Sequence, residues 1–322
     1  MNAAAMKEKF KSRQMGTWVR VIALAVIFAV FTGLNTNFVA PNNLKNLLTD
    51  SVPYLVMGIG VTFVLLIGSI DLSIGAICST STVIVAVLLP TMGYASYAVA
   101  LAAGILAGLI NGLLVVYLKL PSFIATLGTM GAWQSVAYLI SGSSPIQIKK
   151  PQWGLIQWAR VEFGIVPLPF VLALLVLAVF YLAQDKSCFG KSCFAVGVNE
   201  RAATVAGVNV GRTKLVVFTI CGACSALGGM ILAAKLRSGL PTIGATMNMA
   251  VTAAVVLGGT SLSGGKGGQV QTLIGCFMYN MLLSGLNMVG ITSYFQEIVF
   301  GLLMIAAIYF TVDRSDRHTI VK

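Results

Sequence analysis

The sequence predicts an all-α integral membrane protein of about ten transmembrane helices, with both termini in the cytoplasm. Of its 322 residues, 57% are hydrophobic and only 9% are charged, whereas about 25% of the residues in a soluble domain are charged. The mean hydropathy is +0.92, and apolar runs recur along the chain. A soluble fold this poor in charge could not cover its surface, so most of that surface must face lipid.

The expected spans form a single transmembrane domain, 18–312, between polar tails at 1–17 and 313–322. A spanning helix needs about 20 mainly apolar residues, and the first span lacks the small-residue cleavage site of a signal peptide. A broken or re-entrant helix is expected within 52–90, and the eighth span is short for a full crossing. The spans are 18–34, 52–70, 72–90, 94–117, 122–140, 165–183, 215–234, 248–263, 269–289 and 293–312.

The distribution of basic residues predicts the orientation. Lys and Arg in short loops resist translocation and therefore accumulate on the cytoplasmic side. With ten spans, one face carries Lys7, Lys9, Lys11, Arg13, Arg20, Lys119, Lys186, Lys191, Arg201, Arg212, Lys214, Lys266, Arg314, Arg317 and Lys322. The other carries Lys45, Lys149, Lys150, Arg160, Lys235 and Arg237. The first face is therefore expected to be cytoplasmic.

Several function classes are disfavoured. The net charge of +12 is spread between apolar runs, without the dense basic tract that indicates nucleic-acid binding. Cys221 and Cys224 form a CxxC inside an apolar run with no second pair, so neither a metal nor a redox site is expected. The only histidine, His318, lies in the terminal tail, which excludes histidine-based chemistry within the bilayer. An intramembrane enzyme is therefore disfavoured.

The polar connection 184–214 contains a short helix with its own start and stop signals. Asn199 is a suitable N-cap, Glu200–Ala206 is rich in alanine, and Gly207 occupies the usual C-terminal position. Such a helix between two spans is either a docking element for a cytoplasmic partner or an amphipathic linker.

Five segments resemble, in order, the permease subunits of ribose-type monosaccharide ABC importers. They are Gly68–Gly75 (GSIDLSIG), Phe123–Leu127 (FIATL), the loop around Asn199 and Glu200, Ala254–Gly267 (AVVLGGTSLSGGKG) and Gly285–Tyr294 (GLNMVGITSY). The resemblance implies an importer that moves a ribose-like sugar or a related polyol. It also implies a second permease copy or paralogue, two ATP-binding subunits and an extracytoplasmic sugar-binding protein. The residues that it assigns to ATPase coupling are Gly197, Asn199, Glu200, Ala202, Ala203 and Gly207.

The chain has no ATPase site of its own. Gly265-Lys266 suggests a phosphate-binding loop, but a Walker A motif requires G-x4-G-K-[S/T]. Thr260 stands where the motif requires its first glycine, and Gly267 stands where it requires Ser or Thr. The segment therefore does not match the motif at either end. No cofactor is expected on this chain, and ATP would be used by the partner subunits.

Polar residues within the spans are candidates for the translocation pathway. Asp71 is expected at a helix break, where it either accepts backbone hydrogen bonds from Leu72–Ile74 or contacts sugar or protons directly. The other candidates are neutral and could equally join helices: Ser73, Asn111, Thr126, Gln134, Asn248, Thr260, Ser261, Asn287 and Gln296.

One departure from the family concerns the substrate. Ribose-type permeases commonly have an acidic residue upstream of the AVVLGG segment, where this chain has Met247–Val251 (MNMAV). This departure leaves open whether the substrate is ribose, another monosaccharide or a related polyol, and no site role is transferred to this segment. An ion-coupled secondary transporter of a small polar solute is the alternative, because such carriers place ionisable groups at broken helices. A passive pore would need no docking loop.

Overall fold

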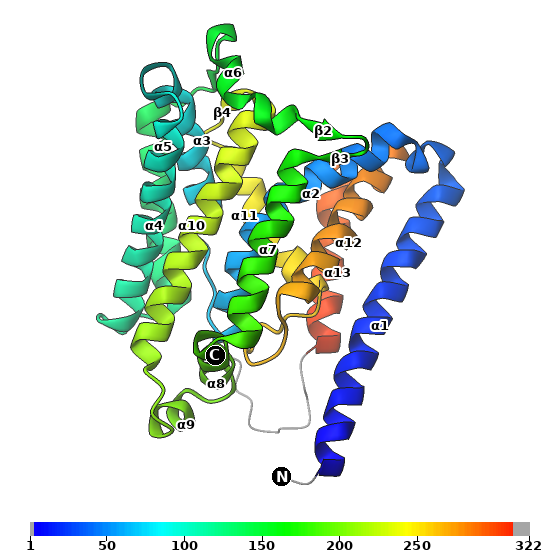
Figure 1. Cartoon of the computed structure of the whole chain (residues 1–322), viewed down its shortest axis with the longest axis vertical. Helices are drawn as coiled ribbons and strands as arrows, with labels where there is room; N and C mark the ends of the chain where they lie inside the picture. Colours follow the sequence, from blue (N-terminus) through cyan, green and yellow to red (C-terminus); the bar gives the residue numbers. More distant parts are fainter. Residues whose placement is uncertain (1–2, 312–322) are drawn as a thin grey trace.

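The computed structural model describes residues 3–311 as a bundle of long helices (Figure 1). The long helices are α1 (Ala3–Leu34), α2 (Pro41–Leu66), α3 (Ile74–Met92), α4 (Ala95–Val116), α5 (Ser122–Ser141), α7 (Leu168–Lys186), α10 (Val210–Leu236), α11 (Ile243–Leu257), α12 (Gln269–Met288) and α13 (Ser293–Thr311). The connections contain η1 (Thr36–Val39), η2 (Lys150–Gln152), α6 (Trp153–Ile156), η3 (Gln157–Arg160), α8 (Cys188–Val198) and α9 (Glu200–Val205). Four strands of two residues complete the described elements: β1 (Ile146–Gln147), β2 (Glu162–Phe163), β3 (Val166–Pro167) and β4 (Ser238–Gly239).

The two ends of the bundle differ in their connections. Helices α8 and α9 and the start of α1 lie at one end, here called the α9 end, and α6 and the strands lie at the opposite α6 end (Figure 1). Strand β1 pairs antiparallel with β4, with Ile146 opposite Gly239, and β2 pairs with β3. The indole of Trp153 donates to the carbonyl of Ile148 at 3.1 Å, and the Arg237 guanidinium lies 3.7 Å from the centre of the Trp153 ring. The segment before α7 is therefore fastened to the connection between α10 and α11.

The all-α membrane architecture predicted from composition is confirmed. Each of the ten ranges expected to span overlaps one long helix of the described chain. Six of these helices, α2, α3, α4, α5, α7 and α10, are long and apolar enough to cross a membrane, and α11 and the apolar part of α1 are shorter. The break expected within 52–90 lies between Leu66 and Ile74.

Several helices run beyond, or stop short of, the ranges expected to span the membrane. Helix α1 already begins at Ala3 in the expected tail, α2 begins well before 52, and α11 ends before 263. Hydropathy detects only the apolar part of a helix, whereas the polar first turns of α2 are stabilised by tertiary contacts: Ser284 on α12 donates to Asn43 Oδ1 at 3.3 Å. The expected tail 313–322 lies outside the described residues.

Small residues bring α4 and α10 into close contact at the core of the bundle. A Cβ atom built on Gly104 would lie 2.3 Å from the Cβ of Ala226, and one built on Gly108 would lie 2.2 Å from the carbonyl oxygen of Phe218. The small-xxx-small spacing of these residues thus lets the two helix backbones approach closely. Helices α2 and α3 are buried behind this pair, so the irregular segment between them lies inside protein.

Candidate functional site

The segment between α2 and α3 is held by a buried polar network. Asp71 Oδ1 accepts from the backbone N–H of Ser73 at 2.8 Å and from its hydroxyl at 2.6 Å. The Asn111 amide on α4 donates to Ser73 Oγ at 2.8 Å and to Asp71 Oδ2 at 3.5 Å. Thr129 on α5 donates to Asn111 Oδ1 at 2.6 Å. The buried carboxylate thus has three donors, as an intramembrane anion requires.

Two further candidates fix the backbone of the same segment. Thr126 Oγ1 on α5 accepts from the N–H of Leu72 at 3.1 Å, and the Asn248 amide on α11 donates to the Leu72 carbonyl at 2.8 Å. Asp71 therefore receives only one of the backbone bonds expected from residues 72–74, because Thr126 takes the bond from Leu72. The Oδ1 atom of Asn248 is buried and has no hydrogen-bond donor among the described residues.

The remaining pathway candidates lie in three other places. Gln134 donates to the carbonyl of Pro241 at 2.6 Å, near the α6 end. Gln296 donates to Asn287 Oδ1 at 2.7 Å, and Asn287 lines a polar pocket of about 280 Å³ together with Asn43, Asn46, Asp50, Asn280, Leu283, Ser284 and Met288. Thr260 and Ser261 lie in the loop after α11, where Thr260 Oγ1 accepts from the N–H of Gly268 at 3.4 Å. The candidates thus do not form one continuous site in a single chain.

The short helix expected in the polar connection is present as α9. Asn199 is its N-cap, with an extended backbone and Oδ1 accepting from the N–H of Ala202 at 3.0 Å. Gly207 has a φ of +84°, which favours glycine after a helix end. Lys214 on α10 lies 2.8 Å from the Glu200 carboxylate. Helix α9 is therefore capped locally and tied to α10.

The two alanines of α9 differ in burial. Ala203 is buried in the main hydrophobic cluster, so it anchors the helix. Ala202 is exposed, as are the apolar side chains of Val198 and Val205, the latter with 90% of its surface accessible. Apolar side chains on an exposed helix are typical of a surface that a partner covers.

Comparison with known proteins decides the family. The family described as "Branched-chain amino acid transport system / permease component" matches residues 43–308. The chain belongs to this permease family. The ribose import permease RbsC of Bacillus subtilis is 36% identical over 305 residues, which are 94% of both chains. The D-allose permease AlsC of Escherichia coli is 31% identical over 290 residues, 88% of both chains. The galactose/methyl galactoside permease MglC of Escherichia coli is 31% identical over 306 residues, 89% of this chain and 91% of MglC. No solved structure gives a significant match.

Sequence analysis of the permease missed a junction of three segments at the α9 end. The N–H of Gly265 donates to the carbonyl of Leu66, the last residue of α2, at 2.9 Å. Gly197 on α8 lies against the same two groups: its Cβ, if present, would be 1.8 Å from the Leu66 oxygen and 2.5 Å from the Gly265 nitrogen. Only glycine fits here. The family resemblance had assigned Gly197 to ATPase coupling, but the sequence carried no sign of its contacts with Leu66 and Gly265.

Helix α8 itself was also missed within the expected loop. Ser187 caps it by accepting from the N–H of Gly190 at 3.2 Å, and a Cβ atom on Gly190 would lie 1.9 Å from the carbonyl oxygen of Gln184. The Gln184 side chain in turn accepts from the N–H of Gln269 at 2.9 Å. The permease therefore presents α8 and α9 as one unit packed against the ends of α2, α7 and α10.

Proposed function

We propose that the chain is the membrane-spanning permease subunit of an ATP-driven importer for a monosaccharide or a related polyol. The similar permeases are named for ribose, D-allose and galactose or methyl galactoside, which supports a monosaccharide rather than one particular sugar. The partners are a second permease, two ATP-binding subunits that use the ATP, and an extracytoplasmic sugar-binding protein.

The observation that carries the coupling part of this proposal is the construction of α9. Its end caps, its ion pair with Lys214 and its buried Ala203 hold it as a rigid body. A rigid helix transmits displacement by a docked ATPase, whereas a flexible loop would absorb it. The exposed side chains of Val198, Ala202 and Val205 supply the docking surface.

A displacement of α8 and α9 has a direct route to the buried polar network. Gly197 contacts the carbonyl of Leu66, and the irregular segment that carries Asp71 begins at the next residue. The loop containing Thr260 and Ser261 meets the same junction through Gly265. Movement of α8 would therefore shift the end of α2 and the α11–α12 loop together. In this proposal, Asp71, Ser73 and Asn111 keep the break in a defined shape.

The proposed orientation places the α9 end in the cytoplasm of a bacterial cell, in the inner membrane, with ten crossings and both termini inside. Lys186, Lys191, Arg201, Arg212 and Lys214 lie in or next to the α8–α9 connection, in agreement with the positive-inside rule. The connection 142–167 would then face the extracytoplasmic binding protein.

Gentle purification of the tagged chain from its native membranes, followed by mass spectrometry, tests the proposal. We expect an ATP-binding subunit to remain attached in equal stoichiometry, and we expect Ala202→Asp to lose it. Ala202→Ser keeps a small side chain and is the matched control that should retain the partner. A folded chain that reproducibly purifies without an ATPase, together with uptake that follows an ion gradient and survives ATP depletion, would overturn the proposal.

A further inference from the structure

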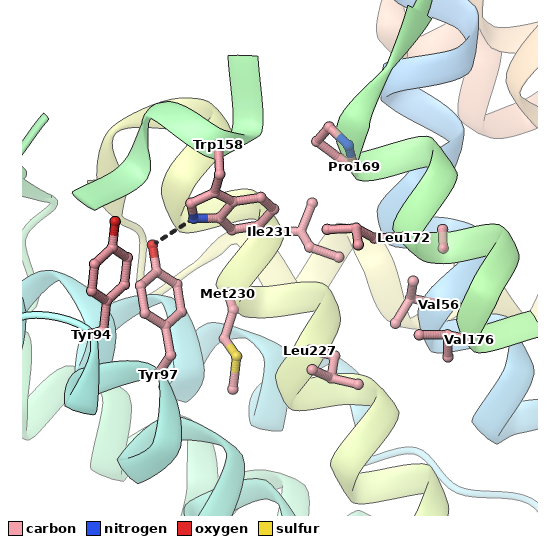
Figure 2. A pocket seen from close by; sticks show the side chains of 11 residues that line it. Val56, Tyr94, Tyr97, Trp158, Pro169, Leu172, Val176, Leu227, Met230 and Ile231 are labelled. Carbon is pink, nitrogen blue, oxygen red and sulfur yellow. Dashed lines mark hydrogen bonds between the residues drawn. The ribbon is translucent and has the colours of Figure 1, made fainter. Parts of the chain in front are cut away.

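An apolar crevice of about 490 Å³ lies between α7 and α10 toward the α6 end. Figure 2 shows Leu172 and Val176 of α7 on one side and Leu227 and Ile231 of α10 on the other, with Trp158 of η3 above them. Val56, Tyr94, Tyr97, Pro169, Ala173 and Met230 complete the lining. Along most of their length α7 packs against α2 and α12, and α10 packs against α4, α2 and α3. The crevice therefore separates two neighbouring helices of the bundle.

The polar groups of the crevice gather at its α6 end. The Trp158 indole donates to the hydroxyl of Tyr97 at 3.3 Å, and this hydroxyl donates to the carbonyl of Leu155 at 3.4 Å. The other walls are aliphatic. Tyr and Trp side chains prefer the membrane–water interface, where one end of the ring is apolar and the other is hydrated. The crevice thus runs from the headgroup level into the hydrocarbon layer.

The face onto which the crevice opens is a lipid-facing one. Leu172 at its rim is 42% exposed, and Leu175 and Val179 on the same helix are 59% and 63% exposed. Apolar walls with nothing packed against them lack dispersion contacts on their open side. Water in the crevice would find few hydrogen-bond partners there. Lipid tails already surround the bundle, however, so apolarity alone gives no preference for the crevice over the bulk bilayer. A bound lipid must be selected by shape and by its headgroup.

An exposed basic residue lies close in sequence to the α6 end of the crevice. Arg160 follows Trp158 by two residues in η3 and has no ion-pair partner among the described residues. The segment 142–161 contains Lys149, Lys150 and Arg160 but neither Asp nor Glu. We infer that the crevice binds one anionic phospholipid of the extracytoplasmic leaflet, with an acyl chain between α7 and α10 and its phosphate at Arg160.

This position relates the lipid to the coupling elements. Helix α7 leads into α8 and α9, and α10 follows them in the chain. At the α6 end η3 contacts both α7 and α10, and at the α9 end α8 contacts both. A chain held in the crevice therefore sets the separation of the two helices that flank the proposed ATPase-docking unit.

Native mass spectrometry of the purified permease, titrated with dioleoyl phosphatidylglycerol or dioleoyl phosphatidylcholine, tests the inference. We expect one retained phosphatidylglycerol. Leu172→Trp fills the crevice and should abolish its retention, whereas Leu175→Trp, one turn further along the same helix and outside the lining, should not. Arg160→Gln should lower the preference for phosphatidylglycerol about fivefold, the effect of one basic residue near an anionic headgroup. Lys150→Gln should leave the preference unchanged.

Two results would overturn the inference. Equal retention by both tryptophan variants would mean that lipid binds only to the general surface. Loss of a permease dimer in Leu172→Trp, with lipid retention unchanged, would mean that a second copy of the chain covers the crevice. Both readouts measure bound mass and not uptake, so the result does not depend on the proposed transport function.

Discussion

Gly197 of α8 lies directly against the carbonyl oxygen of Leu66, where α2 ends. A Cβ atom on Gly197 would be 1.8 Å from that oxygen, far inside van der Waals contact. The same oxygen accepts from the N–H of Gly265, so a side chain would also disturb a backbone hydrogen bond. The contact joins α8 to the segment that leads to Asp71, and its effect on stability can be tested separately from transport.

Gly197→Ala should destabilise the protein by about 1–3 kcal/mol, the usual cost of overpacking a close contact. The matched control is Gly128→Ala in α5, because a Cβ atom there would meet nothing within 4 Å. That replacement should stabilise by up to about 1 kcal/mol, since glycine is a poor helix former. The unfolding midpoint of each variant is measured by heating the protein in detergent and monitoring the folded fraction by size-exclusion chromatography. A normal unfolding midpoint for Gly197→Ala would show that the junction is loose.

Asp71→Asn should lower stability by about 1–3 kcal/mol, because the asparagine amide would turn a donor toward the donors of Ser73 and Asn111. The amount of folded protein and the uptake per folded molecule should be measured together. We expect the amount of folded protein to fall while uptake per molecule is largely preserved. Ser73→Ala removes two side-chain hydrogen bonds without altering the charge and is the control. Normal amounts of folded Asp71→Asn with no uptake would instead give the carboxylate a mechanistic role.

Ala202→Asp should weaken docking of the ATPase and so uncouple ATP hydrolysis from uptake, while the chain still folds, because Ala202 is exposed on α9. The same replacement at Ala203 should prevent folding, since that side chain is buried and an unpaired carboxylate is costly inside a protein. ATPase activity and uptake of the reconstituted complex, compared at equal protein amounts, distinguish the two. Coupled transport at the normal rate by Ala202→Asp would rule out this face of α9 as the docking surface.

Local signals made α9 predictable from the sequence, because a cap and a terminal glycine act within a few residues. The long helices were also predictable, since each must be apolar over the thickness of the bilayer. The start of α2 was not, because its polar first turns depend on partners elsewhere in the chain, such as Lys235 for Asp50.

The arrangement of the polar candidates could not be predicted either. Asp71, Ser73 and Asn111 were each identified, but their connection to one another and to Thr129 depends on how α4 and α5 pack beside the break. Asn287 and Gln296 belonged to the same expected pathway, yet they lie beside a separate pocket near the α6 end. Spacing along the chain indicates which residues are polar within a span, but only the tertiary packing shows which of them meet.

The proposed orientation predicts a side-specific reaction at a single cysteine. Cys188 at the start of α8 is exposed, whereas Cys78, Cys193, Cys221, Cys224 and Cys276 are buried. Burial also raises the pKa of the Cys193 thiol to about 12, so this thiol stays protonated and unreactive below that pH. A membrane-impermeant maleimide at pH 7.5 should therefore label one cysteine per chain in inverted membrane vesicles and none in intact spheroplasts. Cys188→Ser should abolish the labelling. Labelling from outside intact spheroplasts would place the α9 end outside the cell, where no ATPase could reach it, and would reverse the proposed orientation.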